Sequence, residues 1–222
     1  MRAFFVSFLL LNSALCFAQS EDTISQADYN AALEHYNQGT DLYHEKKYKE
    51  ALPLLRYATK LNPYNSDYLF ALSNTQNALG QLDSAVVSIT RAMDMEANQP
   101  DYLMHRANVY FKLKEYRKAA TDYTSALKYQ TDAEVPIMEE HAFFNRGNCW
   151  LYLEEYAKAR ADFDKAIELG YDIANVYHNR ATVLIRLNLK SEASKDFRRA
   201  VELGSTISGK YVEKYCQGWG TT

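Results

Sequence analysis

Three arginines lie in otherwise apolar stretches of this sequence, where a charged side chain could bind an anion or take part in catalysis. Arg146 lies in FFNRGNCW, residues 143–150, and Arg106 and Arg180 lie in the similar tripeptides HRA and NRA. A charge buried in a protein core needs a partner of opposite sign, because removing it from water is costly. The rest of the pattern must therefore decide whether these arginines hold a ligand or a structural partner.

Histidines are the other candidates for chemistry, because imidazole binds metals and transfers protons. Three of the five histidines, His105, His141 and His178, fall toward one side of predicted helices but belong to separate segments. We predict polar histidines without a metal, and a metal site is the less favoured alternative. The sequence contains no nucleophile elbow, P-loop, dinucleotide fingerprint or zinc-binding motif. It therefore predicts no enzyme activity, no catalytic residue and no cofactor.

The composition and charge of the chain argue against several other classes of protein. The 222 residues carry a formal net charge of -3, with acidic and basic residues interspersed. This pattern argues against a nucleic-acid-binding surface and offers no polybasic patch for a membrane. Eight glycines and four prolines are few, whereas 18 tyrosines are many. Such a composition is typical of a packed helical protein and not of a disordered one.

The N-terminal segment MRAFFVSFLLLNSALCFAQS has the features of a secretory signal peptide. Arg2 precedes an apolar core at 4–11, and Cys16 and Ala18 occupy the -3 and -1 places of a cleavage site. We predict cleavage of residues 1–18. A membrane anchor is less favoured because the apolar run is shorter than the ~20 residues that span a bilayer, and the flanking residues fit a lipoprotein poorly. The mature chain is thus predicted to be exported, periplasmic or secreted, without a membrane span. Its start at glutamine resembles exported proteins of Gram-negative bacteria.

The rest of the chain consists of one repeated unit. Aligning NRG, HRA and NRA gives units at 32–65, 66–99, 100–133, 140–173 and 174–207, with an insertion at 134–139. Small residues recur at the eighth, twentieth and twenty-seventh places of every unit, and large apolar residues recur beside them. The eighth-place residues are Gly39, Ser73, Ala107, Gly147 and Ala181. This spacing predicts two helices per unit that approach each other closely.

These units resemble the tetratricopeptide repeat (TPR), and the resemblance covers residues 32–207. It implies an all-α fold, a right-handed α-solenoid of five TPR helix pairs plus a C-terminal capping helix. A polar lead-in is expected at 19–31, becoming helical near its end. The capping helix and tail are expected at 208–222, with Ile207, Tyr211 and Tyr215 as the stripe that covers the last repeat. Cys149 and Cys216 fall in different parts of the array, so we predict no disulfide between them, with Cys149 a small buried residue.

The repeat explains the arginines. They share the seventh place of their units, and each of these units carries an aspartate at the twenty-third place. The pairs are Arg106 with Asp122, Arg146 with Asp162 and Arg180 with Asp196. The two units that lack the arginine also lack the aspartate, and paired presence and absence indicate structural ion pairs between the two helices of a unit. Binding of a ligand's anion is the alternative.

The TPR resemblance also implies a concave groove lined by the second, fifth, ninth and twelfth places of each first helix, which the family commonly uses to hold peptides. The predicted groove residues are Tyr36, Thr40, Phe70, Asn74, Met104, Asn108, Phe111, Phe144, Asn148 and His178. An asparagine amide has one acceptor and two donors, so a row of asparagines could hold an extended backbone. The alternative is that they satisfy neighbouring helices. No lysine occupies the fifth place, so the TPR clamp for acidic chaperone tails is not expected.

The sequence thus predicts a non-enzymatic scaffold that binds a protein or an extended peptide segment in its groove. One alternative is an accessory subunit of a cell-envelope complex that docks through its convex face or its insertion. A metal-binding protein that uses the groove histidines is the least favoured alternative. The pattern leaves open the identity of the partner, the cellular process and whether the chain self-associates.

Overall fold

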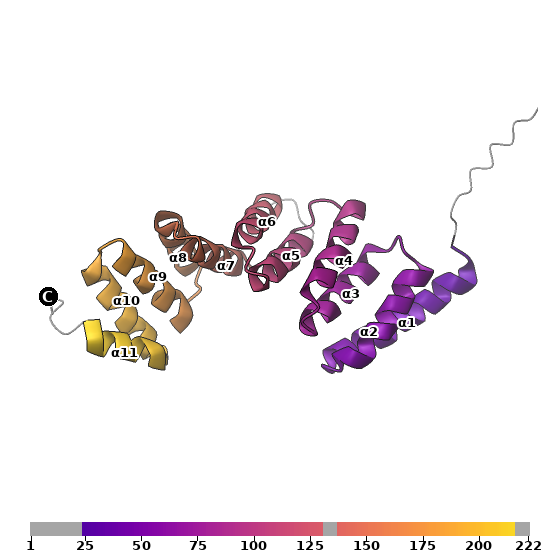
Figure 1. Ribbon diagram of the computed structural model, residues 1–222, viewed down its shortest axis with the longest axis horizontal. Helices are drawn as coiled ribbons and strands as arrows, with labels where there is room; N and C mark the ends of the chain where they lie inside the picture. Colours follow the sequence, from indigo (N-terminus) through magenta and orange to yellow (C-terminus); the bar gives the residue numbers. More distant parts are fainter. Residues whose placement is uncertain (1–23, 131–136, 216–222) are drawn as a thin grey trace, which may run out of the picture.

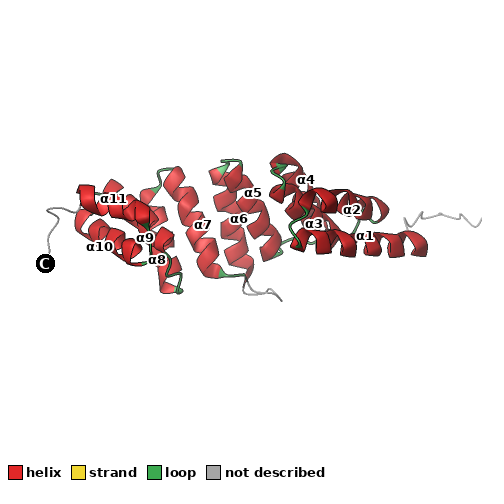
Figure 2. Cartoon of the chain, turned by 90° about the horizontal axis from the view of Figure 1, so that it is seen from below, coloured by secondary structure: helices red, strands yellow, loops and turns green. Residues whose placement is uncertain are grey.

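The computed structural model describes residues 24–130 and 137–215, and every secondary-structure element in this part of the chain is a helix (Figure 2). The helices are α1 Gln26–His44, α2 Tyr48–Leu61, α3 Ser66–Ala78, α4 Leu82–Met95, α5 Pro100–Lys112, α6 Tyr116–Tyr129, α7 Glu139–Tyr152, α8 Tyr156–Glu168, α9 Ala174–Arg186, α10 Lys190–Glu202 and α11 Thr206–Tyr215. They form successive antiparallel pairs that stack along the long axis of the molecule (Figure 1). The predicted all-α solenoid is confirmed.

Close packing within each pair follows from the small residues of the repeat. The alanines at the twentieth and twenty-seventh places are fully buried in all five units. A Cβ added at Gly147 would lie 2.7 Å from Cε1 of Phe163, and one added at Gly39 would lie 2.8 Å from Cγ of Leu55. The large residues beside them, Phe163 and Leu55, have no exposed surface. The helices therefore approach as closely as the side chains at these places allow.

One residue in the turn of each pair has a left-handed backbone conformation. These residues hold the fifteenth place of their units and are Lys46, Gly80, Lys114, Glu154 and Asn188, with φ of 62°, 74°, 62°, 61° and 62°. In the second unit, the N–H of Gly80 donates to the carbonyl of Asn77 at 3.1 Å, and that of Gln81 donates to Gln76 at 2.9 Å. These bonds cap the last carbonyls of the first helix and offset the ~1–2 kcal/mol that this backbone conformation costs a residue other than glycine.

The first helix of the array starts earlier than the repeat does. α1 begins at Gln26, so the end of the polar lead-in is helical, and Ser25 caps it by accepting a hydrogen bond from the N–H of Asp28 at 3.1 Å.

α7 begins at Glu139, one residue before the fourth predicted unit. A hydrogen bond joins the end of the third unit to the insertion, because Gln130 Oε1 accepts from the N–H of Ile137 at 2.8 Å. Residues 131–136 lie outside the described chain.

The packing face of the last helix differs from the predicted stripe. α11 begins at Thr206, and Ile207 is 61% exposed instead of covering the last repeat. Ser208 is fully buried, Val212 packs against the core of the fifth unit, and the ring of Tyr211 stacks on Phe197 at 5.0 Å. Tyr211 of the predicted stripe thus covers the last repeat, but Ile207 does not, because Ser208 takes the inner position and bonds His178 of α9.

Candidate functional site

Each predicted arginine lies against its aspartate. Arg146 donates from Nε to Asp162 Oδ2 at 2.8 Å and from Nη2 to Asp162 Oδ1 at 2.7 Å. Arg106 and Arg180 make the same two bonds to Asp122 and Asp196 at 2.7–3.0 Å. Charge-assisted bidentate pairs of this kind are among the stronger hydrogen bonds in proteins. The bonds to Asp122 raise the pKa of the Arg106 guanidinium.

The third nitrogen of each arginine reaches the preceding unit, which the sequence reasoning missed. Nη1 of Arg106 donates to Thr90 at 3.3 Å, Nη1 of Arg146 donates to Thr124 at 3.0 Å, and Nη1 of Arg180 donates to Asp164 at 2.7 Å. All three acceptors hold the twenty-fifth place of their units, so a recurrent oxygen-bearing side chain was the signal available. We call the arginine, its aspartate and this acceptor a clasp. A clasp joins three helices with one guanidinium.

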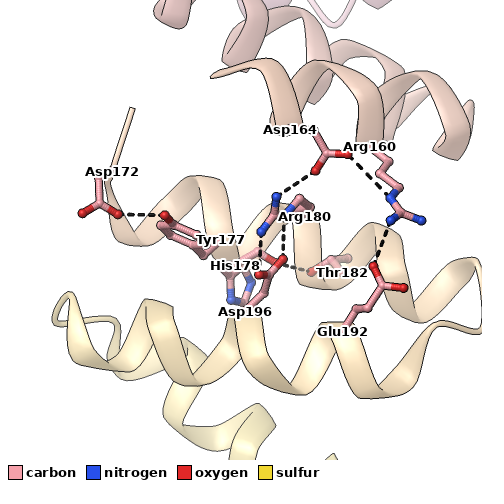
Figure 3. A network of polar contacts seen from close by, with 9 residues as sticks. All are labelled: Arg160, Asp164, Asp172, Tyr177, His178, Arg180, Thr182, Glu192 and Asp196. Carbon is pink, nitrogen blue, oxygen red and sulfur yellow. Dashed lines mark hydrogen bonds and ion pairs between the residues drawn. The ribbon is translucent and has the colours of Figure 1, made fainter. Parts of the chain in front are cut away.

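The clasp of Arg180 belongs to a longer chain of charges (Figure 3). Asp164 also lies 3.6 Å from Nε of Arg160, and Arg160 donates from Nη2 to Glu192 at 2.9 Å. Burial disfavours the charge of Arg180, but its bonds to Asp196 and Asp164 outweigh this effect and raise the pKa of the guanidinium. Nε, Nη1 and Nη2 of Arg180 all donate to carboxylates. Arg180 therefore holds α8, α9 and α10 together.

The ten predicted groove residues lie on the first helices α1, α3, α5, α7 and α9, and all ten are half-buried. Consecutive first helices contact one another, so the residues form a continuous stripe along the array. We refer to this stripe as the groove stripe. A half-exposed aromatic or methionine side chain retains an apolar surface that a partner can cover.

Two of the groove asparagines use their oxygens to join neighbouring helices. Asn108 Oδ1 accepts hydrogen bonds from Tyr123 Oη at 2.6 Å and Asn145 Nδ2 at 3.4 Å. Asn148 Oδ1 accepts one from Asn179 Nδ2 at 2.7 Å. The amide groups of Asn108 and Asn148 donate to no acceptor in the described residues. The Nδ2 groups of both asparagines are thus free to donate to a partner, while their oxygens already accept bonds from neighbouring helices.

The three candidate histidines are separated in the structure. Nε2 of His105 lies 2.8 Å from the Ser73 hydroxyl, and that hydroxyl donates to the carbonyl of Ala85 at 2.7 Å, so the histidine is the donor. Burial lowers the pKa of His105 to about 4, with a smaller contribution from Lys112. His178 bonds Ser208 at 2.8 Å, and burial lowers its pKa. Within the described residues no group of three metal-ligating side chains comes together.

Two hollows lie along the first helices, and the groove stripe lines the first of them. Between α1 and α3 lies a hollow of about 170 Å³, lined by Tyr36, Thr40, Tyr43, His44, Asp67, Phe70, Ala71 and Asn74. Near α11 lies a second hollow of about 310 Å³, lined by Thr182, Ile185, Arg186, Phe197 and Tyr211. Asp67 holds the second place of its unit, which belongs to the predicted groove face, but neither it nor Arg186 was named among the predicted site residues.

No helix within the described ranges is both long and apolar enough to cross a membrane. Cys149 is buried with a free thiol, and burial raises its pKa to about 12. Cys216 and the predicted signal peptide lie outside the described residues.

Stacked helix pairs with a shared, half-exposed inner stripe define an α-solenoid of the kind that serves as a protein-interaction scaffold. Models of the tetratricopeptide repeat match residues 42–109, 100–132, 141–172 and 174–203, which together make up more than half of the chain. The chain belongs to the tetratricopeptide repeat family. No curated protein matches its sequence.

Several solved structures have the same fold. PilF of Pseudomonas aeruginosa matches with a TM-score of 0.66 and 17% identity over 82% of this chain and 80% of that one. MamA of Desulfovibrio magneticus RS-1 matches with a TM-score of 0.71 and 16% identity over 82% and 97%. YrrB, described as a TPR protein with an unusual peptide-binding site, matches with a TM-score of 0.70 and 15% identity over 82% and 92%. At such identities the likeness shows the fold alone.

Proposed function

We propose that this TPR protein binds a protein or an extended peptide segment along its groove stripe and carries out no chemistry of its own. The observation that carries the proposal is the row of donor amides at Asn108 and Asn148. Their oxygens are occupied by neighbouring helices, which fixes the orientation of each amide. Orienting the donors before binding lowers the entropy cost of binding a backbone carbonyl.

The surroundings of these amides support the same function. Met104, Phe111 and Phe144 flank them with half-buried apolar surface. A backbone held by donors and flanked by apolar side chains requires no particular sequence, which suits an extended segment. YrrB, a solved structure with the same fold, is described as having a peptide-binding site. This description supports peptide binding as the class of function.

The test is a pull-down with the mature chain, residues 19–222, from an envelope extract of its own organism. The variant carries Asn108→Asp and Asn148→Asp, which keep the oxygens that bond neighbouring helices and remove the free donors. The matched control carries Asn98→Asp and Asn188→Asp, the same change at two exposed asparagines in turns. All three proteins must melt at similar temperatures.

A partner that the variant loses and the control keeps would support binding through the groove. A partner that both retain would contradict it and direct attention to the convex face or the insertion. That second outcome is the one expected of an accessory subunit in a cell-envelope complex.

We also infer that the chain is exported through its N-terminal segment and works in the periplasm or outside the cell. The inference depends on the charge, apolar core and cleavage site within residues 1–20. The mass of the protein purified from its own cells should correspond to a chain that begins at Gln19. A protein that retains Met1 and stays in the cytoplasmic fraction would contradict it.

A further inference from the structure

The hollow between α1 and α3 combines aromatic walls with one carboxylate. Tyr36, Tyr43 and Phe70 line it, and Asp67 lies among them. The rings are held in place by their neighbours: Tyr36 stacks on Tyr68 at 4.6 Å, and Phe70 packs against Tyr102 at 4.9 Å. Fixed rings present their negative π faces without further loss of side-chain entropy on binding.

The carboxylate of Asp67 has no cationic partner in the described part of the chain. It lies in the first turn of α3, where the helix dipole favours negative charge. Its field is felt nearby, since burial and then the charge of Asp67 raise the pKa of Tyr36. The buried carboxylates of the three clasps, by contrast, are each bonded by two arginine nitrogens.

Elsewhere in the chain, at other places of the repeat, a cation combines with a carboxylate and an aromatic ring. In the third, fourth and fifth units, a clasp arginine bonds a carboxylate and also lies over an aromatic ring. Arg106 lies 5.8 Å from the centroid of Tyr110, Arg146 lies 5.3 Å from that of Phe143, and Arg180 lies 5.6 Å from that of Tyr177.

The first two units have no arginine at the seventh place, where Gln38 and Leu72 stand. Among the described residues, no lysine or arginine lies over the rings of Tyr36, Tyr43 or Phe70, and the imidazole of His44 packs edge-on against Tyr43 at 5.8 Å. The aromatic faces and the carboxylate of this hollow thus have no lysine or arginine of the described residues beside them.

We propose that this hollow binds the lysine or arginine side chain of the partner segment. The proposal rests on groove binding and specifies the chemistry of the partner, a segment that carries a basic residue at the end that meets α1 and α3. The cationic head contacts Asp67, and the stem and charge lie against the aromatic rings. The hollow at the other end of the stripe has Arg186 in its lining and no carboxylate, so a basic side chain is directed to α1 and α3.

The probe is a set of extended glycine–serine peptides with one central arginine, lysine, citrulline or glutamate. Citrulline keeps the shape of arginine without its charge. Binding to the mature chain is followed through the NMR shifts of Ala71 and Asn74, which line the hollow. The arginine peptide should bind at least about fivefold more tightly than the citrulline peptide, and the glutamate peptide should bind most weakly.

Asp67→Asn should abolish most of the preference for arginine, and Phe70→Leu should reduce it. The matched control is Asp83→Asn, which removes an exposed carboxylate from the first turn of the second helix of the same unit. Equal binding of arginine and citrulline peptides, a preference that survives Asp67→Asn, or no binding at millimolar concentration would each overturn the proposal. Groove binding is decided separately by the asparagine variant, so the two ideas can fail independently.

Discussion

The first two units and the last three units hold the same backbone together in different ways. The last three each have a clasp, whose guanidinium joins the two helices of a unit and the helix before them. In the second unit the corresponding places hold Leu72 and Ser88, and the buried Ser88 hydroxyl donates to Gln76 at 2.8 Å. The same places of the repeat are therefore filled by an ionic pair in some units and by neutral side chains in others, and both partners differ together. The hollow that contains Asp67 and its aromatic rings lies between the first helices of these two neutral units.

The largest expected effect comes from breaking a clasp on one side. Arg146→Leu leaves Asp162 buried without its partner, because the Asp162 side chain is only 8% exposed. We expect the free energy of unfolding to fall by ~3–5 kcal/mol. Arg146→Leu with Asp162→Ser, which copies Leu72 and Ser88, should recover most of the loss. Urea unfolding of the three proteins measures this, and a single variant as stable as the wild type would refute the structural role.

The stability of the contact between the second and third units should depend on pH through His105, which bonds Ser73. Its pKa falls from an ordinary value near 6.5 to about 4 on folding. Between these values the unfolded chain binds more protons than the folded one, so stability should fall as pH is lowered from ~6.5 toward 4, by roughly 2–3 kcal/mol. His105→Asn, which places there the residue found in the next two units, should flatten this dependence. Melting temperature against pH is the measurement, and parallel curves would contradict it.

Substitution of the glycines at the eighth place should reveal a smaller difference in stability between the two regions. Gly147→Ala places a methyl group against the rigid ring of Phe163, whereas Gly39→Ala meets the more flexible side chain of Leu55. Overpacking costs ~1–3 kcal/mol and is partly offset by the better helix propensity of alanine. We expect a clear loss of stability for Gly147→Ala and a smaller one for Gly39→Ala. Equal Tm values for both variants and the wild type would show that the helices can separate without cost.

The smallest effect concerns the carboxylate that extends the last clasp. Asp164→Thr gives this clasp the same acceptor residue that Thr90 and Thr124 provide in the other two clasps. Because the Asp164 side chain is 46% exposed, its bonds to Arg180 and Arg160 are screened, and we expect a loss of only ~0.2–1 kcal/mol. The difference between variant and wild type should shrink in high salt. A difference that salt does not change would mean that packing, not charge, accounts for it.

Much of this architecture could be predicted from the repeat. The small residues at the eighth, twentieth and twenty-seventh places indicated how closely the helices pack, and the paired presence of Arg146 and Asp162 indicated what lies between them. These properties depend on contacts within one unit, whose spacing along the chain is constant. The turn residues were harder, because only Gly80 among the five left-handed positions is a glycine. Cap hydrogen bonds made by the backbone, which no side chain reveals, stabilise the other four.

The sequence by itself determined the helix pairs, their register and the positions that share one face of each first helix, because a fixed period places equivalent side chains on equivalent faces. Only the tertiary structure decided what happens between units. It gave the third arginine nitrogen an acceptor in the preceding unit and occupied the oxygens of Asn108 and Asn148. It also turned Ser208 inward in place of Ile207 and brought Asp67 beside Tyr36. Each of these depends on the distance and rotation between one unit and the next, which the spacing within a unit does not specify.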